Sequence, residues 1–549
     1  MGSGEAGGTG VVDTVFRGGV VITGLPAAPR ARAAAVHDGR VVALDEDALD
    51  LASRARQVVD LDGGALLPGF GDGHAHPLWG GVELEGPQVR DCTSVPEVVE
   101  VVRRFAAEHP DEDWVVGGPY DPALAPGGLF DARWLDAGVG NRPVALQSAD
   151  HHCVWANSEA LRRAGLDAHT PDPPSATIAR RPDGSPLGTL VEWSAMDLVL
   201  RHAPMPTADD KRLALRRSTA LLAEAGITWV QEAALHPDDV GSYLDSATAG
   251  ELAVRVNIAL RAEPGDWPDQ RAAFTAARAQ ASSGLAADVV SARTVKLFAD
   301  GVVEAGTAAM IDPYDDAPHS CGLPVWSPAE LAAAVAAFDS DGFQVHIHAI
   351  GDAGVRAALD AVQHATDRNA PRDRRPVIAH TQVVHPDDLP RFAELAVIAN
   401  FEPLWAQLDP LQTALTLPRI GSVRGSWQYP MATLLATGAV LSMGSDWPVS
   451  SHRPLEGLGV AVTRVTSTGD PPGGWLPGQR LPLAAALSAY TLGVAFQAFE
   501  DHRWGTVVPG KRADLVWLAA DPYDVHPAAL GDIEVRGTWL GGAPTYAAQ

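Results

Sequence analysis

His74 and His76 stand two residues apart in the segment Pro-Gly-Phe-Gly-Asp-Gly-His-Ala-His-Pro, residues 68–77. The preceding run, 58–67, is predicted as short extended pieces, and residues two apart on a strand point to the same side. Neutral imidazole is the commonest nitrogen ligand of zinc-like ions, so the pair could supply two ligands to one cation. Taken alone, a His-x-His pair is more often a pair of surface histidines in a Gly-rich loop, and the rest of the chain has to decide.

Four more residues able to bind metal or move protons lie within or at the end of other apolar runs: Lys296, His348, His380 and Asp446. Each has an ordinary alternative, as a lysine reaching water, a core histidine or a turn cap. Lys296, however, lies inside an apolar run, where a free ammonium is costly. A lysine carboxylated by CO₂ would instead be an anion able to bridge two metals. His346 shares a face with His348, which leaves two candidates on that strand.

Short β-branched runs alternate along the chain with stretches rich in Ala and Leu that are typical of helices. The predicted strands are the one ending at His74 and residues 226–232, 254–260, 294–300, 344–350, 376–382, 397–402 and 439–446. Helices are expected over 210–225, 328–339 and 352–363, among others. This order predicts a parallel sheet, and eight units predict an α/β fold of the (β/α)₈ TIM-barrel type. The carboxyl ends of barrel strands converge on one mouth, so together the six residues predict a binuclear metal centre.

Two parts of the chain fall outside the barrel pattern. Residues 79–205 are far longer than a normal crossover, and we expect them to form an inserted cap subdomain beside the mouth. Residues 1–67 and 497–549 contain alternating apolar runs, and we expect them to meet in a small β-sandwich. Residues 68–496 would then be the barrel with its insertion.

The composition is that of a globular protein: 549 residues, 46% hydrophobic and 20% charged. Its 41 basic and 68 acidic residues leave a net charge of -27, which disfavours nucleic acid and anionic lipid as partners. Three scattered cysteines fit a reducing compartment, residues 1–10 suggest a loose tail without signal-peptide features, and no apolar run is long enough to span a membrane. We expect a cytoplasmic protein acting on a small molecule, and a homodimer is compatible with the sequence.

Several motifs together resemble the amidohydrolase superfamily. They are Gly-Phe-Gly-Asp-Gly-His-Ala-His at 69–76, Val-Lys-Leu-Phe-Ala-Asp-Gly at 295–301, His-Ala-Ile-Gly-Asp at 348–352, Ala-His-Thr-Gln at 379–382 and Gly-Ser-Asp-Trp-Pro-Val at 444–449. The likeness runs from about residue 11 to the C-terminus and is strongest to the amidohydrolase-3 branch, often labelled YtcJ-like, which includes N-substituted formamide deformylases.

The resemblance implies two divalent ions, with zinc expected. One ion would be held by His74, His76 and Asp446, the other by His348 and His380, and carboxylated Lys296 would bridge them. His348 rather than His346 falls on the family motif.

The implied reaction is hydrolysis of a C–N bond in an amide, formamide or cyclic imide by a shared hydroxide, with Asp446 as the catalytic proton carrier. A mononuclear deaminase, a metal-dependent decarboxylase or another lyase of the same fold, and a non-catalytic scaffold are the alternatives.

Substrate contacts are expected from the insertion and the strand ends. Residues 150–157 resemble a family loop that faces the metals, with His152 and Asn157 on matching positions. An aromatic mouth suited to an apolar or aryl substituent is predicted from five tryptophans: Trp79, Trp155, Trp405, Trp427 and Trp447. Residues 301–307, Gly-Val-Val-Glu-Ala-Gly-Thr, depart from the usual Gly-Ser-Leu-Gly-Ser-Arg-Thr and place Glu304 near the site. The residues predicted to bind substrate are His152, Asn157, Glu304, Trp405 and Trp447.

Overall fold

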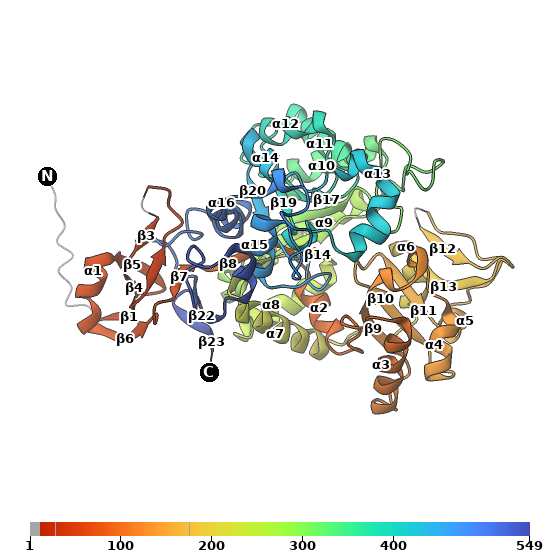
Figure 1. The fold of residues 1–549 in the computed structure, drawn as a ribbon, viewed down its shortest axis with the longest axis horizontal. Helices are drawn as coiled ribbons and strands as arrows, with labels where there is room; N and C mark the ends of the chain where they lie inside the picture. The colour runs from red at the N-terminus through yellow and green to blue at the C-terminus, as the bar shows by residue number, and fades with distance from the viewer. Residues whose placement is uncertain (1–10, 28, 175, 549) are drawn as a thin grey trace.

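The computed structural model describes residues 11–27, 29–174 and 176–548, and its centre is a sheet of eight parallel strands (Figure 1). Neighbours in this sheet follow one another along the chain. The strands are β8 (Phe70–Ala75), β14 (Ile227–Leu235), β15 (Arg255–Arg261), β16 (Val290–Phe298), β17 (Gln344–Ala349), β18 (Val377–His380), β19 (Ile398–Phe401) and β20 (Leu441–Met443). The predicted (β/α)₈ barrel is therefore confirmed.

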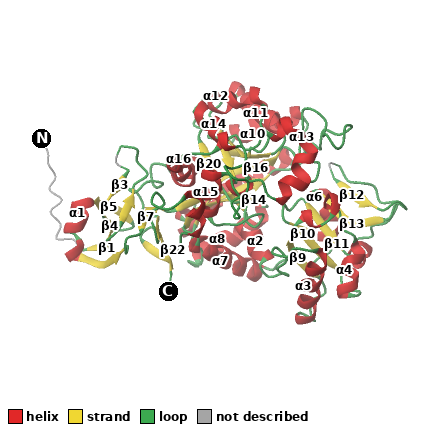
Figure 2. Cartoon of the chain, in the orientation of Figure 1, coloured by secondary structure: helices red, strands yellow, loops and turns green. Residues whose placement is uncertain are grey.

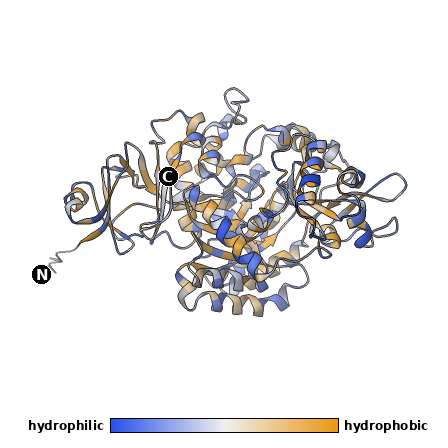
Figure 3. Ribbon diagram, turned by 90° about the horizontal axis from the view of Figure 1, so that it is seen from below, coloured by the Kyte–Doolittle hydropathy of each residue, from blue (hydrophilic) through white to orange (hydrophobic). Residues whose placement is uncertain are grey.

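Helices surround these strands (Figure 2). They are α2 (Pro77–Glu83), α7 (Ala208–Glu224), α8 (Val240–Thr248), α9 (Trp267–Ala281), α10 (Pro328–Ser340), α11 (Asp352–Arg368), α12 (Leu389–Glu394), α13 (Leu417–Gly425), α14 (Met431–Thr437), α15 (Pro454–Thr463), α16 (Leu483–Ser488) and α17 (Val494–Gln497). Helix α7 begins with a capping box between Thr207 and Asp210. Its Leu215 and Leu222 are buried against the barrel, and apolar segments fill the interior of the molecule in Figure 3.

Both chain ends contribute to a sandwich of two sheets at one end of the molecule (Figure 1). One sheet has the order β5-β4-β1-β6, and the other has β23-β22-β21-β7-β2-β3. Phe16 and Trp539 pack edge to face between them, with ring centroids 4.9 Å apart. The strands are β1 (Val12–Arg17), β2 (Val20–Ile22), β3 (Arg30–Ala31), β4 (Ala34–His37), β5 (Arg40–Leu44), β6 (Ala55–Asp60), β7 (Ala65–Pro68), β21 (Leu515–Leu518), β22 (Val535–Leu540) and β23 (Ala543–Ala547). The predicted sandwich is confirmed, and the domain limits at 67 and 497 stay predictions.

The insertion after the first barrel strand contains a sheet of its own at the opposite end (Figure 1). Its strand order is β12-β13-β11-β10-β9. Its elements are α3 (Val95–Glu108), β9 (Val115–Tyr120), α4 (Ala132–Val139), β10 (Val144–Ser148), β11 (Cys153–Ala156), α5 (Ser158–Arg163), β12 (Thr177–Arg180), β13 (Pro186–Val191) and α6 (Trp193–Leu200). The large insertion is confirmed, whereas its limits at 79 and 205 stay predictions.

The predicted strands differ from the observed ones mainly at their ends. β16 begins at Val290 rather than at residue 294, and β20 covers only Leu441–Met443. No helix among the described residues is long and apolar enough to cross a membrane. Residues 1–10, expected as a loose tail, lie outside the described part of the chain.

Hydrogen bonds join the carboxyl-terminal part of the first barrel strand, β8, to the segment that follows the last one, β20. The amide of Asp446 donates to the carbonyl of His74 at 2.6 Å. The Asp72 carboxylate accepts from the amides of Ser445 at 3.0 Å and His74 at 3.1 Å. Burial raises the pKa of Asp72 to about 7, although these hydrogen bonds oppose the rise. Barrel closure therefore places His74 and Asp446 next to each other.

Gln497 connects three barrel strands from within. Its side-chain amide donates to the carbonyl of Gly73 at 2.8 Å and accepts from the Ser442 hydroxyl at 2.6 Å. Its backbone carbonyl accepts from the side chain of Gln344 at 2.9 Å. Gln497 is fully buried, so no water can replace these bonds.

We expect Gln497→Leu to lower the free energy of unfolding by about 2–4 kcal/mol, because it leaves the buried carbonyl of Gly73 without its side-chain donor and the buried hydroxyl of Ser442 without its acceptor. Thermal and denaturant unfolding would measure the loss. Gln280→Leu, the same change at an exposed position of α9, should shift stability by less than about 0.5 kcal/mol. Equal effects of the two substitutions would contradict this role for Gln497.

Candidate metal centre

A cavity of about 870 Å³ lies at the carboxyl ends of the barrel strands. The barrel strands contribute Lys296 and His348 to its wall, the residue after β8 contributes His76, and the insertion contributes His152 and Trp193. The insertion thus lies over the barrel mouth, as expected of a cap. The barrel and the insertion each form part of the cavity wall.

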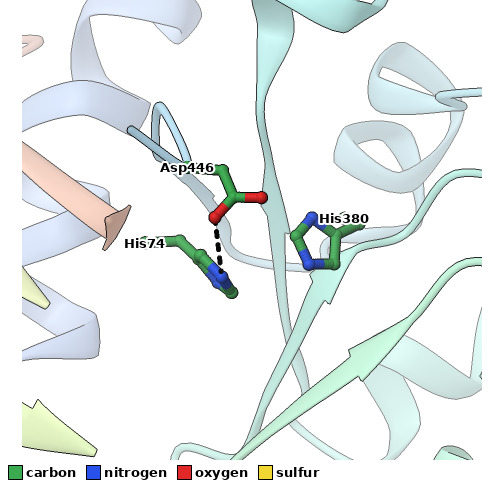
Figure 4. A group of neighbouring side chains, drawn as sticks. All are labelled: His74, His380 and Asp446. Atoms are coloured by element: carbon green, nitrogen blue, oxygen red, sulfur yellow. Dashed lines mark ion pairs between the residues drawn. The ribbon is translucent and has the colours of Figure 1, made fainter. Parts of the chain in front are cut away.

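The structure brings the six predicted metal ligands together in this cavity. The ligand atoms of His74, His380 and Asp446 all lie within 4.8 Å of one another (Figure 4). The ring of His348 lies 4.5 Å from that of His380, measured between centroids. All six side chains belong to buried residues: His74, His76, Lys296, His348, His380 and Asp446.

Asp446 has a carboxylate oxygen whose surroundings suit a cation. Oδ1 of Asp446 is buried and forms no well-aligned hydrogen bond with any described residue. Nevertheless Nε2 of His76 lies 3.0 Å from it and Nε2 of His74 lies 3.4 Å from it. Nitrogen and oxygen donors that approach closely without hydrogen-bond geometry fit a shared metal ion, because each would direct a lone pair at the ion.

Two histidines each have one ring nitrogen engaged and the other free. Nδ1 of His380 lies 2.9 Å from Oε2 of Glu402, and Nε2 of His348 lies 3.1 Å from the carbonyl of Gly301. A carboxylate or carbonyl oxygen accepts a hydrogen bond, so the proton sits on those nitrogens. The lone pairs are therefore on Nε2 of His380 and Nδ1 of His348, which are available to a metal.

The other two histidines have comparable partners. Nδ1 of His74 lies 2.7 Å from Nε2 of His346, and its Nε2 lies 3.3 Å from Nζ of Lys296. Nδ1 of His76 lies 3.5 Å from Oε1 of Glu232. This geometry makes His346 a partner of His74, which favours His348 as the metal ligand on β17.

The backbone is strained at two of these positions. His380 has φ of 71° and Asp446 has φ of 52°, in the left-handed region that non-glycine residues rarely adopt. Such conformations cost on the order of 1–3 kcal/mol each and cluster at functional sites. His380 is the last residue of β18, and Asp446 lies three residues after the end of β20. At both positions the backbone turn directs the side chain towards the centre (Figure 4).

Burial sets the charge states of the cluster. It lowers the pKa of Lys296 to about 7, against the opposing charges of Asp446 and Glu402. It also holds the pKa of His74 and of His348 well below the ordinary value. The imidazoles of His74 and His348 are therefore neutral, the form that binds metal. A large share of the Lys296 amine is unprotonated near neutral pH, the form that reacts with CO₂.

Three of the five predicted substrate contacts line the cavity: His152, Glu304 and Trp405. Nδ1 of His152 lies 2.8 Å from Glu192, and its ring lies 5.6 Å from that of His348. The ring of Trp405 stacks on His380 with an interplanar angle of 2°. Each of these residues can therefore touch a molecule bound beside the metal ligands.

The other two predicted substrate contacts, Asn157 and Trp447, do not line the cavity, so the structure does not support a role in substrate binding for them. Asn157 caps helix α5 by accepting from the amide of Ala160 at 2.9 Å, and it accepts from Val144 as well. Trp447 packs in the barrel core against Gly80. Of the predicted aromatic mouth, Trp79 and Trp405 line the cavity, whereas Trp155 and Trp427 pack outside it.

Sequence reasoning missed the carboxylates that orient the histidines. Glu232 stands near the end of β14, where it also accepts from the amide of Leu78 at 3.3 Å and from the hydroxyl of Tyr243. Glu402 directly follows β19. Both are the last residues of strands predicted from the sequence, so applying the strand-end rule to every strand would have found them.

A barrel with a buried histidine, lysine and aspartate cluster at its mouth defines the metal-dependent hydrolase class of this fold. The model of the amidohydrolase family matches residues 57–546, so the chain belongs to that family. The resemblance inferred from the motifs is thereby confirmed.

Known relatives span nearly the whole chain. Protein LONG AFTER FAR-RED 3 of Arabidopsis thaliana is 30% identical, covering 98% of this chain and 92% of its own length. The N-substituted formamide deformylase of Arthrobacter pascens is 26% identical, covering 94% and 95%. An uncharacterized metal-dependent hydrolase from Pyrococcus horikoshii shares the fold, with a TM-score of 0.73, 22% identity and coverage of 94% and 99%.

We expect Glu402→Ala to weaken metal binding about 10- to 100-fold, because Nδ1 of His380 would lose the acceptor that orients the ring. Competition with a chelator measures the change. Glu394→Ala, at an exposed position of α12, is the matched control and should leave affinity unchanged. Unaltered metal affinity in Glu402→Ala would show that the hydrogen bond does not support a ligand.

Proposed function

We propose that this protein is a metal-dependent amidohydrolase that cleaves a C–N bond in an amide, formamide or cyclic imide. The observation that carries the proposal is the buried convergence of His74, His76, His348 and His380 with Lys296 and Asp446. A second nitrogen of each imidazole lies within 3.5 Å of another polar group of the protein. Such an arrangement has little purpose in a purely structural core, because burying polar groups is costly.

The donor set fits two divalent ions, and we propose zinc. His74, His76 and Asp446 would hold one, His348 and His380 the other, and Lys296 in carboxylated form would lie between them. When bound, such ions lower the pKa of water towards neutrality and polarise the scissile carbonyl.

Asp446 is the proposed proton carrier of the reaction. Its side chain lies beside the ring nitrogens of His76 and His74, within reach of a water held among them. In this position the carboxylate takes the proton of the attacking water and returns it to the departing nitrogen. The insertion forms part of the cavity wall beside these groups.

The remaining wall suits the organic part of a small substrate. Aromatic rings of Trp79, Trp193 and Trp405 line it and favour an apolar or aryl substituent. His152, held by Glu192, is placed to contact the carbonyl or the leaving group.

A screen of N-formyl and N-acyl amines with zinc-loaded protein tests the function directly. We expect amine release that stops when a chelator removes the metal and returns when zinc is restored, with about two ions per chain by elemental analysis. Ammonia from an amidine or CO₂ from an acid as the product would favour a deaminase or a decarboxylase. Metal-independent turnover would rule out the proposal.

Lys296 offers a separate test of the bridge. Lys296→Ala should abolish activity and reduce metal content, and added acetate or propionate should partly restore both by occupying the vacated place. Lys296→Arg should remain inactive, because guanidinium keeps its charge and cannot take up CO₂. Near-normal turnover of Lys296→Arg would exclude lysine carboxylation.

A further inference from the structure

Four carboxylates line the cavity without any cationic partner. They are Asp121, Asp150, Glu304 and Asp409, and none forms an ion pair with a residue that the structure describes. By contrast, cationic side chains of the same wall have acids of their own. Lys211 lies 2.5 Å from Asp239, and Arg261 lies 2.5 Å from Glu263.

Neutral donors fix the four carboxylates and do not cancel their charge. Asp121 accepts from the amide of Ala123 at 2.8 Å, and Asp409 accepts from the amide of Gln412 at 2.8 Å. Glu304 accepts from the hydroxyl of Thr416. Asp150 accepts from the amide of His152 at 3.1 Å and from the hydroxyl of Ser148.

The carboxylates also repel one another. Burial raises the pKa of Glu304, and the charges of Asp150 and Asp409 add to the rise. Burial raises the pKa of Asp409 as well, with a contribution from Asp121. A cation placed among these groups would relieve the repulsion.

A second, independent feature of this wall is the hydroxyl of Tyr429. Tyr429 is only 1% exposed and lines the same cavity. Its hydroxyl has no hydrogen-bond partner within the described chain. Burial, with the charges of Glu304 and Asp409, raises the pKa of this hydroxyl well above its ordinary value. A buried polar group aimed into a cavity without a partner in the protein points to a bound molecule.

The spacing argues for an organic cation rather than a metal ion. Groups of three or more acidic, histidine or cysteine ligands within 4.8 Å of one another occur twice in the described residues, and neither group includes these four carboxylates. A molecule with several N–H donors can satisfy dispersed acceptors that a single ion cannot reach. Trp405, on the same wall, adds an aromatic ring able to attract a cation.

We propose that Asp121, Asp150, Glu304 and Asp409, together with Tyr429, bind an ammonium or guanidinium group of the substrate. The substrate would then be an amide or formamide that carries a cationic group apart from its scissile bond. The identification of the ligand as a substrate rests on the proposed function, whereas cation binding itself does not.

The test compares N-(2-phenylethyl)guanidinium with N-(2-phenylethyl)urea, which have similar shape and N–H donors but differ in charge. Isothermal titration of the zinc-loaded protein in 0.15 M NaCl, at about the ionic strength where surface charges are largely screened, would measure both affinities. We expect the guanidinium to bind about tenfold more tightly or better, and Glu304→Gln/Asp409→Asn to remove most of this preference.

The substituted amides can still accept the hydrogen bonds of Thr416 and Gln412. Melting temperature and metal content would verify that the double variant is folded. If it is not, Tyr429→Phe, which removes only the hydroxyl, should still weaken guanidinium binding. Glu394→Gln is the matched control outside the cavity and should retain the full preference.

Equal affinity for the two probes in the unmodified protein would overturn the proposal, as would an unchanged preference in the folded double variant. The outcomes are distinguishable from those for the proposed function. Tighter binding of the guanidinium without hydrolysis of any amide would reject the proposed hydrolase function and keep the cation subsite. Hydrolysis of an amide with equal binding of the two probes would support the hydrolase function and reject the cation subsite.

Discussion

The burial of six polar side chains at one point of the barrel is the constraint on which the site depends. Desolvation penalises every charge there, which keeps His74 and His348 neutral and lowers the pKa of Lys296 to about 7. Neutral imidazole and unprotonated amine are the states that coordinate metal and take up CO₂. The apolar surroundings of the barrel thus favour the uncharged forms of these residues even without a bound metal ion.

Burial also makes an unpartnered hydrogen-bonding atom costly, which accounts for the polar residues that surround the cluster. Glu402, Glu232, His346 and the carbonyl of Gly301 each face the ring nitrogen of a different histidine. These contacts fix the tautomer and the rotation of each ring. The closing contacts of the barrel act in the same direction, since Asp72 holds the end of β8 against the segment that follows β20.

Much of this could be predicted because the barrel rule converts sequence order into position. His74, Lys296, His348, His380 and Asp446 are widely separated in the sequence, yet each lies within or at the end of a predicted strand, and they meet in one place. The barrel rule does not predict the role of a residue when that role depends on the direction in which its side chain points. Asn157 and Trp447 lie close in sequence to site residues, but one caps a helix and the other packs in the core.

The orienting carboxylates were missed for a related reason. Glu232 and Glu402 end predicted strands, so the strand-end rule could have located them, but no spacing along the chain links an acid to the histidine that it orients. His346 and His348 show the same limit, since residues two apart share a face, and in the structure the contact between His346 and His74 tells them apart. Long-range pairing of side chains is a property of the closed barrel and not of any single segment.

The structure divides chemistry and selectivity between different parts of the chain. All six proposed ligands come from strand ends or the turns after them, where the backbone is held on both sides by the sheet. The unpaired acids Asp121, Asp150, Glu304 and Asp409 come instead from the insertion and from loops after β16 and β19. Loops tolerate substitution more readily than barrel strands. Charge complementarity to a substrate could therefore change here while the geometry of the metal centre stayed the same.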